Sequence, residues 1–449
     1  MAVAVAPIRS HRVSPLERIE LLCDPGSVHA IRSQVGDGVV GAAGRVEGRP
    51  VFAYAQDSSF AGGSLGTAHA DTILRVMQLA ERAEAPVVGF VESAGARMQE
   101  GLAALGGFGR IFSANVALSG RVPQISVVTG VSAGGGSYSP ALTDFVVMVD
   151  GSSMFLTGPG VVREAIGEDV DVATLGGTRV HERNGVCDLV AADVPDAARV
   201  TRALLSFLSP VRVAAVPAPP GDPARFVPQS PRKTYDVRDV IRSIADAGDF
   251  LELAPRWARN MVTGFGRIEG RAVAVVANQP RYLGGVIDSA ASEKAARFVR
   301  TSSSLGLPLV VFVDTPGFMP GVSQESAGVI RHGAGLLRAF SEARVPRLTV
   351  VLRKAYGGAY ITMNSKDLGA HLTFAWPDAE LGVMAARQAV GIIHRRELEN
   401  DGSHSRDQLA DRYASEHLGA AVAARNGFID ELIAPAETRE RLAWGLSTL

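Results

Sequence analysis

The chain has 449 residues, a formal net charge of -1 and a hydrophobic fraction of 47%. This length predicts two or three domains, each large enough to bury a core, and the balanced charge excludes the broad basic surface of proteins that bind nucleic acid or anionic membranes. The two cysteines, Cys23 and Cys187, form no Cys-X-X-Cys pair, so we expect neither a metal site nor a disulfide framework.

Nothing in the sequence predicts insertion into a membrane or export. No stretch reaches the roughly 18 apolar residues that a membrane-spanning helix needs. The opening apolar run ends before Arg9 and is too short for the core of a signal peptide. We therefore expect a soluble protein of the cytoplasm.

In chain order, apolar runs at 86–91 and 125–128 predict strands, each followed by a glycine-rich turn and a helical pattern. Seven prolines between Pro210 and Pro231 then predict a linker. A helix is expected at 235–244, because Val237, Val240, Ile241 and Ile244 share one helical face. Two further strands, at 309–313 and 348–352, repeat the first arrangement, and residues 406–449 have a charged helical pattern. The alternation of strands and helices predicts an α/β fold.

The two halves also repeat each other in sequence, at an offset of 222 residues. Gly44-Arg-Val-Glu-Gly-Arg-Pro-Val returns as Gly266-Arg-Ile-Glu-Gly-Arg-Ala-Val, and Gly62-Gly63 returns as Gly284-Gly285. The segment that begins at Pro123 matches the one that begins at Pro346 with one inserted residue, at an offset of 223. The sequence thus predicts two domains of one fold, 1–225 and 226–449, each with a similar site.

The same chemical feature follows a strand in both halves. Gly134-Gly135-Gly136 follows the strand at 125–128, and Gly357-Gly358-Ala359 follows the one at 348–352. Small residues at a strand-to-helix turn expose backbone N–H groups at the positive end of the helix dipole, where an oxyanion can bind. Tight packing of helix on strand is the alternative reason for such glycines. Their recurrence in both halves favours two oxyanion sites, and the upstream turns at 93–96 and 315–318 offer further donors.

A serine hydrolase is a rival hypothesis, because Gly130-Val-Ser132-Ala-Gly134 fits the Gly-X-Ser-X-Gly nucleophile motif. In the second copy, however, Ala355 stands at the position of Ser132, so the repeated turn does not depend on a hydroxyl group. The histidines available as a general base are unspecific candidates, namely His181, His332 and His394.

Several longer motifs resemble those of the carboxyltransferase (beta) subunits of biotin-dependent acyl-CoA carboxylases, of the acetyl-CoA and propionyl-CoA type. They are Glu92-Ser-Ala-Gly-Ala-Arg-Met-Gln-Glu-Gly, Ser139-Pro-Ala-Leu-Thr-Asp-Phe-Val-Val-Met, Phe155-Leu-Thr-Gly-Pro, Ser292-Glu-Lys-Ala-Ala-Arg-Phe-Val-Arg, Val313-Asp-Thr-Pro-Gly-Phe-Met-Pro-Gly and Arg353-Lys-Ala-Tyr-Gly-Gly-Ala-Tyr. The resemblance covers nearly the whole chain. It implies two tandem crotonase-like domains, an active site between domains of different subunits, and a homo-hexamer built as a trimer of dimers.

The resemblance also implies roles for individual residues. Gly134 and Gly135 would hold the enolate of the acyl-CoA thioester, on the side of domain 1–225, and Gly358 and Ala359 would hold the ureido oxygen of biotin, on the side of domain 226–449. The implied substrate-binding residues are Ser93, Ala94, Gly95 and Ala96 along the path of CoA, with Gly136, Tyr138, Tyr360 and Ile361. Propionyl-preferring relatives often carry Asp at the position of Ile361, so an apolar residue there favours acetyl-CoA or a broader range of short acyl groups.

We therefore predict transfer of CO2 from carboxybiotin to acetyl-CoA or propionyl-CoA, giving malonyl-CoA or methylmalonyl-CoA for fatty-acid or polyketide supply. The chain has no biotinyl Met-Lys-Met segment and no ATP-grasp glycine loop, so biotin should be attached to a partner, the biotin carboxylase and carrier (alpha) subunit. No metal is expected in this chain. Two alternatives remain open: a decarboxylase subunit that runs the reverse reaction, and an idle subunit that supports an active relative.

Overall fold

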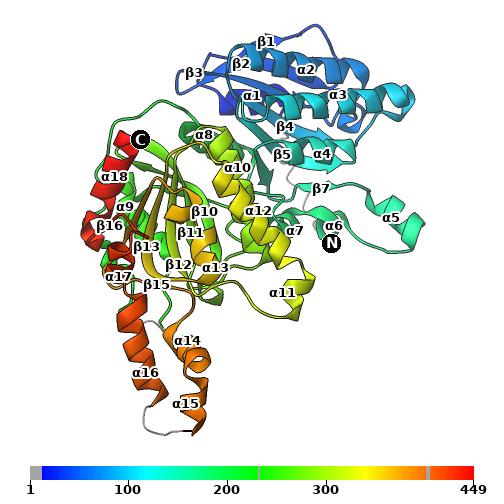
Figure 1. Ribbon diagram of the computed structural model, residues 1–449. Coiled ribbons are helices and arrows are strands. Elements are labelled where there is room, and N and C mark those ends of the chain that lie inside the picture. Colours follow the sequence, from blue (N-terminus) through cyan, green and yellow to red (C-terminus); the bar gives the residue numbers. More distant parts are fainter. Residues whose placement is uncertain (1–12, 231–232, 401–404) are drawn as a thin grey trace, which may run out of the picture. The chain divides into compact units, whose positions relative to one another are not determined.

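The computed structural model describes residues 13–230, 233–400 and 405–449 (Figure 1). The predicted absence of a signal peptide concerns residues outside this range, as does Pro231 at the end of the predicted linker. Contacts divide the chain into two compact units, Met1–Ser206 and Phe207–Leu449. No helix among the described residues is long and apolar enough to cross a membrane.

The first unit is a sheet with helices packed on it. Its strands are β1 (His29–Ile31), β2 (Val39–Val46), β3 (Arg49–Gln56), β4 (Val87–Ser93), β5 (Gln124–Ala133), β6 (Phe145–Val149), β7 (Ser153–Phe155) and β8 (Leu189–Ala191). Its helices are α1 (Pro15–Leu22), α2 (Thr67–Arg82), α3 (Leu102–Leu118), α4 (Gly135–Leu142), α5 (Pro159–Ile166), α6 (Val172–Gly176), α7 (Thr178–Asn184) and α8 (Val194–Phe207). The strand order is β1-β2-β3-β4-β5-β6-β8, and β7 pairs with the end of β5.

The second unit repeats this plan. Its strands are β9 (Phe250–Leu253), β10 (Met261–Ile268), β11 (Arg271–Asn278), β12 (Leu309–Thr315), β13 (Arg347–Tyr356), β14 (Leu372–Ala375), β15 (Glu380–Gly382) and β16 (Glu431–Leu432). Its helices are α9 (Val237–Ile244), α10 (Ser289–Ser304), α11 (Val322–Ser326), α12 (Val329–Glu342), α13 (Gly357–Thr362), α14 (Ala386–Ile393), α15 (Arg395–Asn400), α16 (Arg406–Tyr413), α17 (Ala420–Arg425) and α18 (Thr438–Thr448). Read from β9, the order is β9-β10-β11-β12-β13-β14-β16, with β15 paired to β13.

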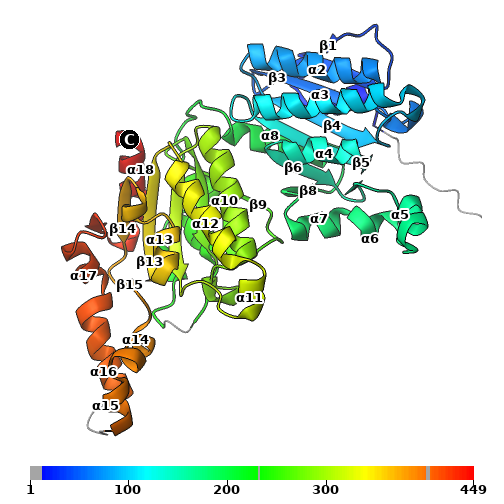
Figure 2. The same ribbon diagram turned by 45° about the vertical axis from the view of Figure 1, so that its right-hand side comes forward.

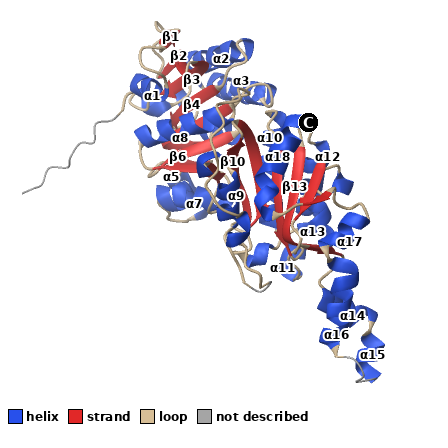
Figure 3. Ribbon diagram, turned by 90° about the vertical axis from the view of Figure 1, so that its left-hand side faces the viewer, coloured by secondary structure: helices blue, strands red, loops and turns tan. Residues whose placement is uncertain are grey.

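The two strand orders are the same, which confirms the predicted α/β fold with an internal duplication. Figure 3 shows the strands of each sheet among their helices. In the second unit α10 and α12 lie side by side on one face of the sheet, and α14 to α16 extend away from it (Figures 1 and 2). Helices on a largely parallel sheet follow from the crossover connections that parallel strands require.

The repeated Glu-Gly pair has a clear structural reason. Glu47 and Gly48 connect β2 to β3 with φ values of 52° and 76°, and Glu269 and Gly270 connect β10 to β11 with 50° and 76°. Positive φ at both central residues is typical of the tight turns that match the twist of a β-hairpin. The repeated Glu-Gly pair therefore marks a hairpin that lies next to the first strand of each sheet.

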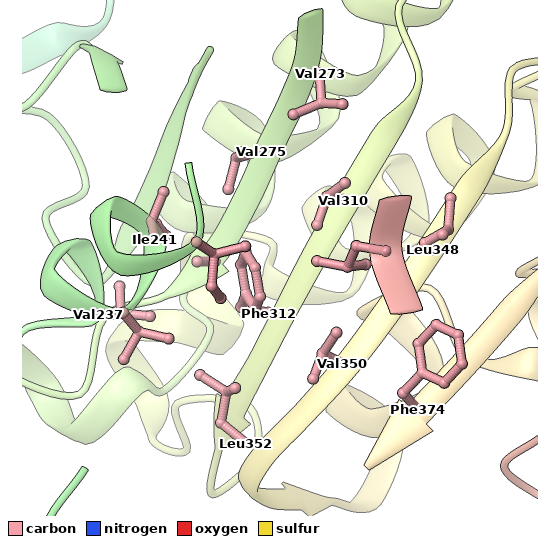
Figure 4. Close-up of a cluster of buried hydrophobic side chains, with 14 of the residues drawn as sticks. Val237, Ile241, Val273, Val275, Val310, Phe312, Leu348, Val350, Leu352 and Phe374 are labelled. Atoms are coloured by element: carbon pink, nitrogen blue, oxygen red, sulfur yellow. The ribbon is translucent and has the colours of Figure 1, made fainter. Parts of the chain in front are cut away.

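The core of the second unit shows how the strand patterns are used. Val310 and Phe312 of β12, like Leu348 and Val350 of β13, point from the sheet into one buried cluster, and α9 contributes Val237 and Ile241 to it (Figure 4). Each such side chain is almost fully buried, and burial of a large apolar side chain contributes about 1.5–3 kcal/mol. Predicting a helix near 235–244 from its apolar face was correct, because that face covers this cluster.

The division between the units lies at 206/207, whereas the proline pattern placed it at 225/226. Residues 211–217 belong to the second unit because they form hydrogen bonds with its other residues. The N–H of Val213 donates to Gly270 O at 3.0 Å, and the N–H of Ala247 donates to Pro217 O at 3.0 Å. Prolines mark where helices and strands stop, but they do not reveal which domain an irregular segment packs against.

Predicting helix throughout 406–449 was wrong in part. The segment contains α16, α17 and α18, but also the two-residue strand β16, which pairs with β14 in parallel register. This strand completes the edge of the second sheet where β8 completes the first. A strand of two residues is too short to show an alternating pattern of apolar and polar residues in the sequence.

Candidate active site

Each predicted glycine turn lies where a central strand meets a helix. Gly134 joins β5 to α4 with φ 57° and ψ -125°, and Gly357 follows β13 with φ 61°. The strand residues before them, Ala133 and Tyr356, occupy equivalent places, paired with Phe155 of β7 and Gly382 of β15. Positive φ at these two positions favours glycine. Gly134 and Gly357 therefore shape the two turns in the same way.

The N–H groups that follow are candidates for oxyanion donors. Gly135 and Gly136 open α4, and Gly358 and Ala359 lie in the first turn of α13. The first N–H groups of a helix have no acceptor within it. No hydrogen bond found among the described residues uses these four N–H groups, whereas the N–H of Gly134 donates to Phe155 O at 3.0 Å.

The equivalent donor pairs are thus Gly135 with Gly136 and Gly358 with Ala359. The sequence-based assignment used Gly134 and Gly135 in the first half, a pair shifted by one residue from that in the second. The bond from Gly134 to β7 accounts for the difference, because it occupies the N–H and leaves Gly134 to set the backbone direction. A bond to a strand some 20 residues further along the chain gives no signal in the local sequence.

The two turns differ in the space around them. A Cβ atom added to Gly135 would lie 2.7 Å from Phe108 Cγ, and one added to Gly136 would lie 3.0 Å from Ser132 Oγ. A Cβ atom added to Gly358 would meet nothing closer than Phe318 Cε2, at 3.9 Å. Helix α3 therefore packs tightly over the first turn, while the second turn has open space beside it.

That space is a cavity of about 510 Å³ in the second unit. It is lined by Gly357, Gly358, Tyr360, Ile361, Asp367, Leu381, Gly382, Val383, His417, Val422, Ala423, Asn426 and Phe428. The side chain of Ile361 is 45% exposed and faces this space. A largely apolar cavity with Gly358, one of the two candidate donors, in its wall suits a small, flat group that carries one polar oxygen.

The two tyrosines of the predicted site lie in different surroundings. Tyr360 donates its hydroxyl to Phe428 O at 3.3 Å, and burial raises its pKa to about 12, so the hydroxyl stays protonated. Tyr138, on α4, is 51% exposed and its ring lies 6.1 Å from that of Phe112. Tyr360 is therefore part of a cavity wall, and Tyr138 is part of an exposed aromatic surface.

A π-helix, η7 (Ala414–Leu418), forms part of the cavity wall and was missed by the sequence analysis. Its His417 lines the cavity, and its Leu418 packs on Gly382, where an added Cβ would lie 2.2 Å from Leu418 Cδ2. Single π-helical turns occur often at functional sites. Their i to i+5 bonding produces no recognisable residue spacing, so only the structure reveals them.

Backbone N–H groups of the upstream turn at Ser93–Ala96 form hydrogen bonds within the protein. The N–H of Ala94 donates to Gly62 O at 3.0 Å, and the N–H of Gly95 donates to Ser93 Oγ at 3.2 Å. Ser93 is buried, Ala94 is exposed, and Ala96 forms a bridge with Leu65. At least two of the four N–H groups are thus engaged within the protein.

The structure also removes the hydrolase hypothesis. Ser132 is 0% exposed, and its Oγ has no hydrogen-bond partner among the described residues. His181, in the same unit, bonds through Nε2 to Met154 O at 2.8 Å. A nucleophile must be reached by substrate and contact a base, and Ser132 meets neither condition.

Comparisons with known proteins now bear on this geometry. The family described as the carboxyl transferase domain matches residues 12–449 of the chain. The chain belongs to this carboxyl transferase family. The carboxyltransferase is 48% identical over 427 residues to the propionyl-CoA carboxylase carboxyltransferase subunit of Haloferax mediterranei, covering 92% of this chain and 83% of that one.

Further relatives agree. The carboxyltransferase is 46% identical over 442 residues to the biotin-dependent acetyl-/propionyl-coenzyme A carboxylase beta6 subunit of Mycobacterium tuberculosis, covering 96% of this chain and 93% of that subunit. A solved transcarboxylase 12S, a hexamer described with methylmalonyl-CoA and methylmalonic acid bound, has a TM-score of 0.92 at 43% identity, covering 97% of this chain and 89% of that one.

These findings confirm the predicted family and the fold of two crotonase-like domains. The protein is an enzyme of the biotin-dependent acyl-CoA carboxylase type, and its family transfers carboxyl groups with CoA thioesters as substrates. No three His, Cys, Asp or Glu side chains in the described part of the chain are grouped as a metal site requires.

Proposed function

We propose that this carboxyltransferase moves CO2 from carboxybiotin, carried by a partner subunit, to the α-carbon of a short acyl-CoA. The observation that carries the proposal is the pair of equivalent glycine turns, each with two unengaged N–H groups at a helix start. Carboxyl transfer to a thioester passes through two anions, an enolate and a ureido anion, and each needs preorganised donors. One turn per anion meets that need without a side-chain base.

In this proposal Gly135 and Gly136 hold the thioester oxygen, so the first unit is the acyl-CoA side. Gly358 and Ala359 hold the ureido oxygen, so the second unit is the biotin side. The cavity beside Gly358 fits a compact bicyclic ring, because apolar side chains line most of it and Gly358 lies in its wall. Bound carboxybiotin supplies CO2 and accepts the α-proton of the acyl group; the chain binds, orients and excludes water.

We also propose acetyl-CoA and propionyl-CoA as substrates, with Ile361 contributing to the choice between them. Ile361 is apolar and lines the cavity assigned here to biotin, so it would contact the short acyl chain where that chain meets biotin in a site shared between subunits. One methylene in an apolar pocket changes discrimination by about 1–3 kcal/mol. By analogy with the 12S protein we propose a homo-hexamer, which works in the cytoplasm with a separate biotin carboxylase and carrier subunit.

The test is reconstitution of the purified chain with a carboxylated biotin carrier protein and an equal mixture of acetyl-CoA and propionyl-CoA. We expect malonyl-CoA and methylmalonyl-CoA, both lost in Gly358→Leu and retained in the control Gly335→Ala. Gly335 lies on α12 with nothing within 4 Å of an added Cβ. Absence of both products, with carboxybiotin intact and CoA bound, would contradict the proposal and favour a decarboxylase or an idle subunit.

A further inference from the structure

Each glycine turn is joined to its neighbouring short strand by a side-chain hydrogen bond, and the side chain that forms this bond differs between the two units. In the first unit it is Ser137, the third residue of α4. Its hydroxyl donates to Ser132 O at 2.7 Å and accepts from the N–H of Phe155 at 3.1 Å. One buried hydroxyl thus connects the end of β5, the start of α4 and strand β7.

The second unit cannot form this bond. The residue at the position of Ser137 is Tyr360, and its hydroxyl reaches away from the strands to Phe428 O. Besides the backbone pairing of β13 with β15, a side-chain contact between the turn and β15 is made by Tyr356, which immediately precedes Gly357. The Tyr356 hydroxyl forms a short hydrogen bond with Glu380 Oε2 of β15.

This bond has no counterpart in the first unit. Ala133 stands at the position of Tyr356 and carries no hydroxyl. Ser153 stands at the position of Glu380, and its Oγ is buried without a hydrogen-bond partner among the described residues. In each unit a side-chain hydrogen bond therefore joins the turn to the short strand, and the two bonds occupy different positions.

Strand β15 also carries the cavity wall. Leu381, Gly382 and Val383 follow Glu380 and line the cavity, and Glu380 itself forms a bridge with Gly419 next to the π-helix. The N–H of Ala420 donates to Ala379 O at 2.9 Å. A bond from Tyr356 to Glu380 therefore connects the turn that carries Gly358 to the strand whose next residues, Leu381 and Gly382, line the same cavity.

We propose that the Tyr356–Glu380 hydrogen bond positions the second glycine turn, as Ser137 positions the first, and so sets the distance between the donors and the cavity wall. The assignment of biotin to this turn rests on the proposed function; the positioning itself does not. Tyr356 is buried, and burial, followed by the bond to Glu380, raises its pKa. The phenol is therefore protonated and donates, and a bond to a carboxylate is stronger than one between neutral groups.

The experiment uses the full chain with free biotin and malonyl-CoA, and follows release of acetyl-CoA as the carboxyl group passes to biotin. Tyr356→Phe and Glu380→Ala remove the bond, Glu380→Gln keeps an acceptor, and Ser153→Ala is the control at the matching position of the first unit. Hydrogen exchange of peptides 356–363 and 134–142, measured by mass spectrometry, reports the turns directly.

We expect Tyr356→Phe and Glu380→Ala to raise KM for biotin roughly tenfold, because a misplaced donor pair loses its alignment, with KM for malonyl-CoA changed less than about twofold. Exchange at 356–363 should quicken while that at 134–142 stays the same. The KM for biotin of Glu380→Gln should remain within about threefold of the wild-type value. That of the control Ser153→Ala should equal the wild-type value.

Unchanged exchange at 356–363 and an unchanged KM for biotin in Tyr356→Phe would overturn the proposal. Should Tyr356→Phe not fold, the glutamate variants decide: a loosened turn in Glu380→Ala but not in Glu380→Gln supports it, and two native-like turns overturn it. Faster exchange together with a raised KM for malonyl-CoA would keep the positioning role and overturn the assignment of biotin to this turn.

Discussion

The two glycine turns of this carboxyltransferase have similar backbone conformations, but the side chains around them differ. Gly134 and Gly357 have φ values of 57° and 61°, and each is followed by two N–H donors. Phe108 covers the first turn, whereas a cavity of about 510 Å³ lies beside the second. The duplicated turns thus keep the same backbone donors and differ in the walls beside them, as we would expect if each turn holds a different anion in the proposed reaction.

The largest effect is expected at the open turn. Gly358→Ala places a methyl group among the donors without a clash, since the nearest atom to its Cβ is 3.9 Å away. Carboxyl transfer should fall about 10²–10³-fold, the usual cost of a lost oxyanion donor, while the melting temperature stays within error. Steady-state rates and calorimetry measure both, with Gly335→Ala as control. A variant with full activity would show that the second turn holds no anion.

A pH dependence should separate the units. Burial, the largest cause, lowers the pKa of His69 to about 4, and the matching residue of the second unit is Ala291. The unfolded His69 binds a proton below pH 6.5 and the folded one does not, so stability is lost as pH falls from about 6.5 toward 4. The loss caused by His69 should reach at most about 3 kcal/mol and act on the first unit; in the second unit burial also lowers the pKa of His371, which causes a separate loss at a site outside α10.

Hydrogen exchange in α2 and α10 between pH 7 and pH 4.5, corrected for intrinsic rates, measures that difference. Protection should fall in α2 of wild type and much less in His69→Gln, which is destabilised at every pH but cannot gain the proton. Equal losses in α2 and α10, or an unchanged slope in His69→Gln, would assign the effect to other groups.

The covered turn should respond in stability as well as activity. Gly135→Ala drives a Cβ to 2.7 Å from Phe108 Cγ, and overpacking of this kind costs about 1–3 kcal/mol. Adding Phe108→Leu should recover part of the stability but not the activity, because the methyl group still lies at the donors. Urea denaturation of the single and double variants, with Gly109→Ala on α3 as control, measures the recovery. Full recovery of activity would mean that Gly135 serves packing alone.

The smallest expected effects compare the two matching hydroxyl groups. Ser137→Ala breaks buried bonds of 2.7 and 3.1 Å and should cost about 1–2 kcal/mol. Tyr360→Phe breaks one bond of 3.3 Å at a partly exposed site and should cost about 0.5 kcal/mol. Local exchange at 134–142 and 356–363 tests the order. A larger cost for Tyr360→Phe would show that it, and not Tyr356, fastens the second turn.

The sequence determined the family and the fold and predicted the two glycine turns, because all three depend on short local patterns. Glycines at the ends of apolar strands marked the turns, the Glu-Gly pairs marked the hairpins, and repetition at an offset of 222 residues marked the two domains. Repetition also argued against Ser132 as a nucleophile, which its complete burial confirmed.

The tertiary structure alone decided which groups stay free and which are engaged. The bond of Gly134 to Phe155, the clash waiting at Gly135, the π-helix at 414–418 and the Tyr356–Glu380 contact all join residues from different elements. The same holds for residues 211–217 of the predicted linker, which form hydrogen bonds with the rest of the second unit. Such contacts depend on packing between elements, and the spacing of residues along the chain does not predict them.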